Sequence, residues 1–588
     1  MKLLHQNENR TEKTEQKGRI IMARKIVVVG GVACGPKSAS RARRMDPDAE
    51  ITIIERGEIL SYAGCGLPYF ISGDVPDIKE LMCTPLGVVR DTAFFKNVKD
   101  INVLNRTLAE KIDRKKKEVH TINVQSGEKD VVSYDSLVLA TGGMPFTPPI
   151  DGVDLNRVFK LTYVEDAQAI DTALKKGDVK KAVIIGGGLI GVEVTEALVK
   201  RGLSVTIVEM MDRILPGLFD DEMSAFLTGH LVQKGVSVMT DTKVSRIVGD
   251  SQGGVVAVET DKGKVDADMV LVAVGVRPNV KLGADAGLDV GPRGGLVVNE
   301  RMQTSDPDIY AGGDCVEQMR LVGGQKVFVP MGSTANKHGR VIGTNITGGS
   351  DTFKGVLGTG IVKVFDFNAG TTGLSEAAAK EAGFDVMTTL SPAPDKAHFY
   401  PDALPIGIKL IADKKTRKLL GAQIIGPGVV DKRLDVVITA ITFGATVDDL
   451  ANLDLAYAPP YSPAMDNIIT AANVLRNKLD GLALGYSPQE VKEKLDKKED
   501  FVILDARMPE ELEEIGRIDS KNVINIPLGA IRKRIDEIPR DKEIVTMCKI
   551  SLRGYEALKI LEGMGYSKLA FLDGGMLLWP YERTKTLP

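Results

Sequence analysis

A cysteine set between two glycines is the residue of this sequence best placed for chemistry. Cys65 lies within residues 61–69, Ser-Tyr-Ala-Gly-Cys-Gly-Leu-Pro-Tyr, shortly after an apolar run that ends at Glu55. The positions five before and five after it hold Leu60 and Phe70, so no second cysteine is placed to close a local disulfide. An isolated cysteine is most often a small apolar residue packed beneath a loop. The alternative is a thiol that bonds to a diffusible sulfur compound or reacts as a lone thiolate.

Cys548 is the second candidate for sulfur chemistry. It follows the apolar run of residues 544–547 and begins a loop that reaches Arg553, and a helix is expected from Tyr555. A strand end, a short loop and a helix N-terminus place several backbone N–H groups around one point. Such a ring stabilises a thiolate or persulfide anion, and the guanidinium of Arg553 adds to this effect.

The elements before Cys65 predict a nucleotide site. Residues 25–29 form an apolar run, and residues 30–35 read Gly-Gly-Val-Ala-Cys-Gly before a helical pattern. Strand, glycine turn, helix and a strand with an acidic end form the context that a dinucleotide fingerprint requires. The glycines let the backbone approach a pyrophosphate, and Glu55 would accept hydrogen bonds from ribose hydroxyls. Val32 stands where a second glycine is usual, so an ordinary βαβ turn stays an alternative.

A second fingerprint is more complete. Residues 186–191 read Gly-Gly-Gly-Leu-Ile-Gly after the apolar run of residues 182–185, and the next apolar run ends at Glu209. A carboxylate at this position would accept from a 2′-hydroxyl and repel a 2′-phosphate, which favours NADH over NADPH. The two fingerprints imply two bound dinucleotides.

Further junctions between strands and glycine turns follow each fingerprint. Residues 137–143 and 271–278 are apolar runs that end in glycine turns, and residues 304–314 end in Gly-Gly-Asp. Asp314 is placed to accept a hydrogen bond from a ribityl hydroxyl, while the helix N-terminus after it faces phosphate.

These motifs together resemble the FAD/NAD(P)-dependent pyridine nucleotide–disulfide oxidoreductases, over residues 24–479. The resemblance implies an α/β fold with two Rossmann-like domains, an FAD domain interrupted by an NAD domain, followed by an α+β dimerisation domain. It therefore implies a homodimer. It assigns contacts with FAD or NADH to Gly30, Gly31, Val32, Ala33, Gly35, Glu55, Arg56, Thr141, Gly142, Gly186, Gly188, Gly191, Glu209, Gly275 and Asp314.

Residues 61–69 resemble the branch of this family that keeps a single redox cysteine. That branch includes coenzyme A (CoA)-disulfide reductases, NADH-dependent persulfide reductases, and NADH oxidases or peroxidases. The oxidases and peroxidases typically carry a histidine where Ala33 stands, so the resemblance favours the CoA-linked enzymes. Residues 454–463 match the CoA-disulfide reductase pattern and imply that Tyr457 of the partner subunit donates to the leaving thiolate at Cys65. Simple packing of the tyrosines at a subunit interface is an equal alternative.

The same resemblance assigns substrate-binding positions. Cations on the helix after the first fingerprint suit the nucleotide phosphates of CoA, although a solvated charged face is the alternative. Gly64 stands where relatives commonly have Asn, and Met465 where some have Lys. The implied substrate residues are Lys37, Arg41, Arg44, Ser61, Gly64, Asn336, Tyr400 and Tyr461.

The C-terminal residues resemble a rhodanese domain, an α/β module that transfers sulfane sulfur. The resemblance rests on residues 504–507, the loop of residues 548–553 and residues 573–575. It implies catalytic roles for Cys548 and Arg553. Ser551 stands where relatives often have Gly, and an inactive module that only binds partners is the alternative.

Length and composition set the frame for these predictions. The 588 residues are expected to form about four domains. A net charge of −3 gives no basic field for nucleic acid, and no apolar run is long enough to span a membrane. Five scattered cysteines indicate reduced thiols in a cytoplasm, and no metal site is expected. The expected division is a disordered extension over 1–22, the FAD domain over 23–150 and 276–345, the NAD domain over 151–275, the dimerisation domain over 346–480 and the rhodanese domain over 481–588.

The sequence thus predicts an FAD-dependent NADH oxidoreductase that reduces sulfur–sulfur bonds of CoA persulfide, polysulfide or CoA disulfide. Cys65 would carry the redox step, and Cys548 would relay sulfane sulfur. One alternative is an NADH oxidase, with oxygen as acceptor and Cys65 passing through sulfenic acid. Another is a redox-sensing binding protein whose rhodanese module is inactive.

Overall fold

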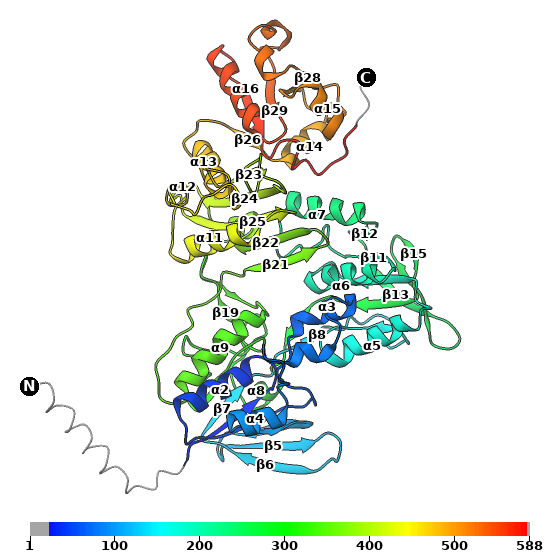
Figure 1. Ribbon diagram of the computed structural model, residues 1–588, viewed down its shortest axis with the longest axis vertical. Helices are drawn as coiled ribbons and strands as arrows, with labels where there is room; N and C mark the ends of the chain where they lie inside the picture. Colours follow the sequence, from blue (N-terminus) through cyan, green and yellow to red (C-terminus); the bar gives the residue numbers. More distant parts are fainter. Residues whose placement is uncertain (1–22, 585–588) are drawn as a thin grey trace, which may run out of the picture.

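The computed structural model describes residues 23–584, and Figure 1 shows them as a series of α/β parts. The first sheet consists of β1 (Lys25–Val29), β2 (Glu50–Ile54), β3 (Asn102–Leu104), β7 (Ser136–Leu139) and β18 (Ile309–Ala311). It is parallel, in the order β18-β7-β1-β2-β3. Because β18 follows the whole second sheet in sequence, the chain leaves the first sheet and returns to complete it.

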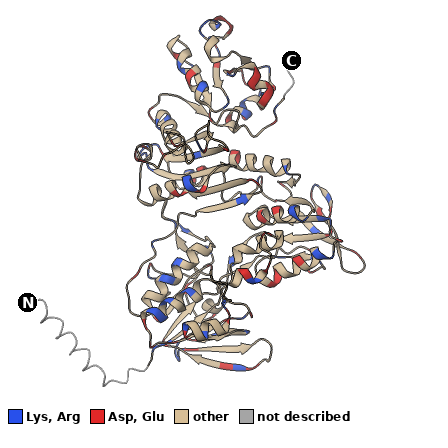
Figure 2. Cartoon of the chain, in the orientation of Figure 1, with Lys and Arg blue, Asp and Glu red and all other residues tan. Residues whose placement is uncertain are grey.

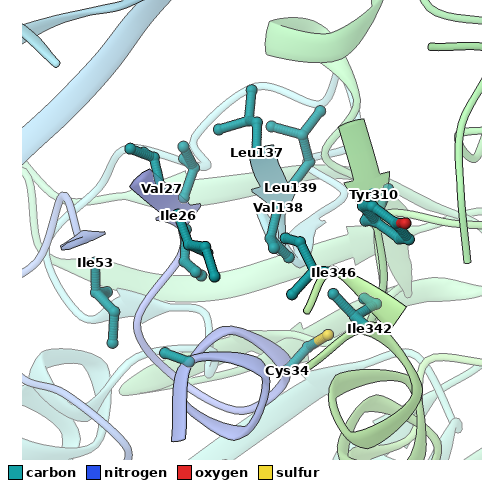
Figure 3. Close-up of a cluster of buried hydrophobic side chains, with 14 of the residues drawn as sticks. Ile26, Val27, Cys34, Ile53, Leu137, Val138, Leu139, Tyr310, Ile342 and Ile346 are labelled. Atoms are coloured by element: carbon teal, nitrogen blue, oxygen red, sulfur yellow. The ribbon is translucent and has the colours of Figure 1, made fainter. Parts of the chain in front are cut away.

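The first sheet is apolar on both faces, as parallel sheets covered by helices usually are. Val28 of β1 pairs with Ile53 of β2 on one side and with Val138 of β7 on the other. Figure 3 shows side chains of α2 (Cys34–Met45) and α9 (Gly332–Asn345) packed beneath this sheet, among them Cys34 and Ile342. Burial of these side chains fixes the glycine turn between β1 and α2.

The second sheet repeats this plan. Its strands are β9 (Val158–Phe159), β10 (Lys181–Ile185), β11 (Ser204–Val208), β12 (Ser237–Met239) and β16 (Met269–Val272). They are parallel, in the order β12-β11-β10-β16-β9. The helices beside it are α5 (Val164–Lys175), α6 (Leu189–Lys200) and α7 (Asp221–Gln233).

Short elements surround these two sheets. Three of them are small antiparallel sheets. One holds β4 (Thr107–Asp113), β5 (Glu118–Asn123) and β6 (Lys129–Ser133), and another holds β13 (Val244–Gly249), β14 (Val255–Thr260) and β15 (Gly263–Asp266). The third pairs β19 (Gln318–Met319) with β20 (Lys326–Val327). The chain passes from the first sheet to the second through β8 (Gly143–Pro145) and returns through β17 (Val276–Pro278), and these two strands pair antiparallel. The short helices are η2 (Gly64–Gly66), α3 (Leu67–Ser72), η3 (Ile78–Met82), α4 (Thr92–Lys99) and α8 (Lys281–Asp285).

The third sheet is antiparallel, in the order β21-β22-β25-β24-β23. Its strands are β21 (Gly360–Val364), β22 (Phe367–Gly373), β23 (Val386–Pro394), β24 (Pro405–Asp413) and β25 (Leu419–Gly426). The helices of this part are α10 (Glu376–Glu381), α11 (Asp431–Thr442), α12 (Val447–Ala451) and α13 (Asn467–Leu479). Ile408 and Ile424 of the sheet pack with Val437 and Leu475 of the helices in one buried cluster.

The last sheet is parallel again, in the order β26-β30-β29-β27-β28. Its strands are β26 (Gly485–Tyr486), β27 (Phe501–Asp505), β28 (Val523–Asn525), β29 (Glu543–Met547) and β30 (Leu569–Leu572). Its helices are α14 (Pro488–Asp496), α15 (Pro509–Ile515), η4 (Leu528–Ala530), η5 (Ile535–Glu537) and α16 (Leu552–Gly563). In Figure 1 this part lies against the third sheet, at the opposite end of the molecule from the first sheet.

Within residues 23–584 no helix is long and apolar enough to cross a membrane. The expected extension over residues 1–22 lies outside the described residues.

Candidate active site

Cys65 is an exposed free thiol on a rigidly seated loop. It lies in η2, directly before α3, whose Leu67 is buried. The N–H of Ala63 donates to the carbonyl of Leu81 at 2.8 Å, and a Cβ added at Gly66 would overlap the Leu81 side chain. The backbone around the sulfur is therefore held by η3. The residue as a whole is exposed, although nearby groups partly enclose its thiol.

The loop of Cys65 is also bonded to the first glycine turn. Ser61, with a left-handed φ of 48°, donates its N–H to the carbonyl of Gly31 at 2.8 Å. The carboxylate of Glu55 accepts from the N–H of Gly31 at 2.6 Å and from that of Gly57 at 2.7 Å. The loop of Cys65 and the predicted nucleotide turn thus form one hydrogen-bonded unit.

Glu209 makes the equivalent contacts in the second turn. It accepts from the N–H of Gly187 at 2.7 Å and from that of Met211 at 2.8 Å. Glu55 and Glu209 were predicted to contact ribose, but their hydrogen bonds to the glycine turns were not predicted. Each carboxylate oxygen has two lone pairs, so both residues keep acceptor capacity for a ribose hydroxyl.

The fingerprint glycines play two different roles. A Cβ at Gly35 would overlap the carbonyl oxygen of Gly30, and one at Gly191 would overlap that of Gly186, so these glycines let each helix close onto its turn. A Cβ at Gly188 would meet nothing within 4 Å. The protein itself does not require a glycine there, which suits the close approach of a ligand backbone.

The remaining predicted cofactor positions lie on the turns that follow β2, β7, β16 and β18. Gly142 and Gly275 have left-handed φ values, and an added Cβ at either would meet nothing within 4 Å. Thr141 is bonded through its hydroxyl to the carbonyl of Asn279 at 2.6 Å. The carboxylate of Asp314 has no hydrogen-bond partner within residues 23–584, and burial raises its pKa to about 6. Such a carboxylate gains from hydroxyl donors on a ligand. Arg56, another predicted cofactor residue, donates to the hydroxyl of Tyr163 at 3.2 Å.

Acidic neighbours oppose ionisation of Cys65. Burial is the main cause that raises the pKa of its thiol, and the carboxylates of Glu193 and Asp314 raise it further. Burial, with Glu196 nearby, raises the pKa of Glu193 to about 7. Burial and then Glu193 also raise the pKa of Tyr69. The described residues therefore favour the neutral thiol over the thiolate.

Glu193 was not among the residues predicted for the site. Its signal in the sequence is a carboxylate two positions after Gly191, among the apolar residues that begin α6. Next to it, Glu196 pairs with Lys363 of β21 and with Lys200 at 3.0 Å, and Lys200 reaches Asp74 at 2.8 Å. This network ties α6 to the third sheet and to the segment after α3.

The predicted tyrosines lie on a different surface of the same chain. Tyr457 and Tyr461 are 54% and 69% exposed, and Tyr400 is 37% exposed. The N–H of Ala397 donates to the carbonyl of Pro459 at 3.4 Å, which brings the loops of Tyr400 and Tyr461 together. Within the described residues no hydrogen bond joins either loop to the loop of Cys65.

The predicted substrate cations line a tightly packed helix pair. Lys37 and Arg44 of α2 are exposed, and Arg41 donates to the hydroxyl of Thr344 on α9 at 3.0 Å. Figure 2 shows basic residues on both α2 and α9. Asn336 of α9 is exposed, but its side-chain amide donates to the carbonyl of Gly332 at 2.9 Å.

The second sulfur site is arranged differently. Cys548 is fully buried at the end of β29, and Arg553 forms a two-pronged pair with Glu511 of α15 at 2.6 and 2.5 Å. Glu511 is the principal cause of the raised pKa of Arg553, and Cys548 is a smaller one. Arg553 was predicted from the loop itself, whereas Glu511 was not, because it comes from another element, α15.

Position 551 has a backbone conformation that favours glycine, although this chain has a serine there. Its φ is 74°, in the left-handed region, and its hydroxyl donates to the carbonyl of Leu572 at 3.2 Å. A non-glycine residue in this region costs roughly 1–2 kcal/mol. The loop therefore keeps its turn with serine at position 551.

The two sulfur sites are well separated within one chain. In Figure 1, α3 lies beside the first two sheets and α16 lies beyond the third sheet. A direct exchange between Cys65 and Cys548 of the same chain is therefore not built into the fold.

The fold and these sites define a class. Residues 24–327 match the pyridine nucleotide-disulphide oxidoreductase family, residues 359–469 match the dimerisation domain of that family, and residues 487–581 match the rhodanese-like domain. The chain belongs to the pyridine nucleotide-disulphide oxidoreductases. The family and the fold class predicted from the sequence are thereby confirmed.

The chain is similar to several proteins within this family. The chain is 37% identical over 456 residues, 77% of its own length and 99% of the relative's, to an NAD(P)H sulfur oxidoreductase (CoA-dependent) of Pyrococcus furiosus. It resembles an NAD-dependent persulfide reductase from A. fulgidus, with a TM-score of 0.90 and 48% identity, over 94% of this chain and 100% of that one. It also resembles reduced CoADR-RHD of Bacillus anthracis, with a TM-score of 0.88 and 37% identity, over 95% and 98% of the two chains.

Proposed function

We propose that this protein is an FAD-dependent NADH oxidoreductase that reduces the sulfur–sulfur bond of CoA persulfide, polysulfide or CoA disulfide. The observation that carries the proposal is the exposed, unpaired thiol of Cys65 on a loop bonded to the nucleotide turn. Cys34 and Cys315 are buried, so neither is placed as its partner. The sulfur relatives and the rhodanese-like domain support the choice of acceptor.

The residues present fit the two cofactors. Two features support this: the open space beside Gly188, Gly142 and Gly275, and the carboxylate of Asp314, which has no hydrogen-bond partner among residues 23–584. A bound dinucleotide would fill the first and pair with the second. We assign Glu55 and Asp314 to FAD, and Gly188 and Glu209 to NADH. When bound, these cofactors supply hydride transfer and the electron pair that cleaves a disulfide.

In the proposed reaction the protein's own chemistry takes place at Cys65. Its thiolate attacks the outer sulfur of a persulfide, or one sulfur of CoA disulfide, and a CoA thiolate leaves with the bonding electrons. Two electrons and a proton then break the new sulfur–sulfur bond, which returns Cys65 and releases sulfide or a second CoA thiol. Since nearby carboxylates oppose the thiolate, we assign the balancing donor to Tyr457 of the partner subunit.

The proposal also assigns the residues that bind the substrate, the oligomeric state and the domain division. Lys37, Arg41 and Arg44 would bind the CoA phosphates, with Ser61, Gly64, Asn336, Tyr400 and Tyr461 along the substrate. The exposed tyrosine loops and the dimerisation domain support a homodimer. Five free cysteines support a reducing cytoplasm. The separate sheets support the division of the chain predicted from the sequence, with Cys548 as sulfur carrier.

The decisive experiment measures NADH oxidation with CoA persulfide, polysulfide, CoA disulfide and oxygen as acceptors. We expect a sulfur acceptor to exceed oxygen, and Cys65→Ser to lower that rate at least about 100-fold. Cys83→Ser, at a partly exposed cysteine, is the matched control and should leave the rate unchanged. Undiminished turnover by Cys65→Ser, or oxygen as the best acceptor, would overturn the proposal.

A further inference from the structure

The loop that follows β30 supports the loop of Cys548. The N–H of Met576 donates to the carbonyl of Cys548 at 2.9 Å, and that of Leu577 donates to the carbonyl of Lys549 at 2.9 Å. Gly575 has a left-handed φ of 55°, and a Cβ added there would lie 2.6 Å from the carbonyl oxygen of Cys548. The backbone of the sulfur loop therefore rests directly on residues 575–577.

The other side of the same loop is bonded to the third sheet and its helices. Asp573 accepts from the ammonium of Lys478, on α13, at 2.5 Å and from the hydroxyl of Thr389, on β23, at 3.3 Å. The N–H of Gly574 donates to the carbonyl of Leu390 at 3.1 Å. Residues 573–577 thus connect the dimerisation domain with the loop that carries Cys548.

The ion pair in this connection is almost completely buried. The side chains of Lys478 and Asp573 are 6% and 3% exposed. Burial raises the pKa of Asp573, and Lys478 counteracts that rise. If one partner is removed, the other is left as an uncompensated buried charge, because water cannot replace the missing partner. The loop would then have to move, or Asp573 would have to take up a proton.

We propose that Lys478, a residue of the dimerisation domain, is a positioning residue for sulfur transfer at Cys548. Lys478 holds Asp573, and residues 575–577 hold the carbonyls of Cys548 and Lys549. The orientation of those peptide groups sets the direction of the N–H groups around the sulfur. This inference rests on the proposed sulfur transfer at Cys548, and it adds that the docking of the last module shapes its sulfur site.

The test uses sulfur transfer from thiosulfate to cyanide by the full-length protein. The Cys548 thiolate attacks the outer sulfur of thiosulfate, the sulfur–sulfur bond breaks, and sulfite leaves with the electron pair. Cyanide then takes the outer sulfur of the persulfide as thiocyanate and restores the thiolate. NADH-dependent reduction of CoA disulfide by the same preparation serves as the internal reference, because it uses Cys65.

We expect Lys478→Met to lower the kcat of sulfur transfer about tenfold, with the KM for thiosulfate within about twofold and CoA-disulfide reduction unchanged. Thr389→Val removes only the weaker contact to Asp573 and should give a fall of about two- to threefold in the same direction. Lys559→Met is the matched control, since Lys559 donates to the carbonyl of Leu482 near the same junction and, among the described residues, has no hydrogen bond or ion pair with residues 573–577. It should change neither activity.

A kcat of Lys478→Met within about twofold of wild type would overturn the inference. Equal losses of both activities would assign Lys478 to overall folding and would also overturn it. If the wild type transfers no sulfur and matches Cys548→Ser, the proposed role of Cys548 fails. The rate at which iodoacetamide alkylates Cys548, measured by mass spectrometry of the full chain, then tests the coupling without turnover. An unchanged rate in Lys478→Met would exclude it.

Discussion

At position 65 the chain places a thiol where its own carboxylates disfavour the reactive anion. Burial, Glu193 and Asp314 all raise the pKa of this thiol. In the proposed reaction this free cysteine forms its sulfur–sulfur bond with an incoming molecule. The protein therefore keeps the thiol protonated until a donor or a bound group offsets the negative field.

Glu193→Gln tests this field. The thiolate is the form that reacts with iodoacetamide, and the Glu193 carboxylate, with a pKa of about 7, is charged above neutral pH. Its removal should lower the pKa of Cys65, so the pH profile of alkylation moves to lower pH. Glu259→Gln, on β14 and paired with Arg246, is the control and should leave the profile in place. A profile that does not move would show that Glu193 has no influence on the thiol.

At the scale of elements, small residues decide how closely the helices approach. The contact between α2 and α9 positions the glycine turn and the predicted substrate cations. On α9, a Cβ added at Gly339 would lie 2.6 Å from the carbonyl oxygen of Cys34 and 2.8 Å from the Cβ of Lys37. A Cβ added at Gly229 in α7 would meet nothing within 4 Å. The same residue type thus serves packing in one helix and has no packing role in the other.

Alanine at these two glycines should have opposite effects. Gly229→Ala should stabilise the protein by about 0.5–1 kcal/mol, because alanine is the better helix former. Gly339→Ala should destabilise it by about 1–3 kcal/mol, because the overpacked contact with α2 exceeds that gain. Thermal unfolding of both variants beside the wild type measures the difference. Stabilisation by Gly339→Ala would contradict the close contact of the two helices.

At the scale of the whole molecule, buried ion pairs join parts that the sequence separates widely. Lys409 of β24 is 1% exposed and contacts Asp220 at 3.0 Å, Glu222 at 2.6 Å and Glu376 at 2.8 Å. Two of these carboxylates come from α7 and the residue before it. This cluster, like that of Glu196 and Lys363, holds the second sheet against the third.

Lys409→Met should therefore lower the free energy of unfolding by about 3–5 kcal/mol, because it leaves buried carboxylates without their cation. Lys414→Met removes a comparable charge from an exposed pair with Asp385 and should change stability by less than about 1 kcal/mol. Denaturant unfolding, followed by fluorescence, compares the two variants. Equal and small effects would show that the buried cluster does not hold the sheets together.

The sequence by itself determined the features that are local in the chain. Both glycine turns, the unpaired Cys65 and the strand, loop and helix around Cys548 are read from neighbouring residues, because hydrophobic period and turn chemistry act over short stretches. The family and the α/β architecture followed from several such motifs taken together. Only the tertiary structure decided which distant groups meet them: Glu193 near Cys65, Glu511 on Arg553, and Lys478 on Asp573. These contacts join residues far apart in sequence, and burial in the packed core, rather than local pattern, sets which charges face each other.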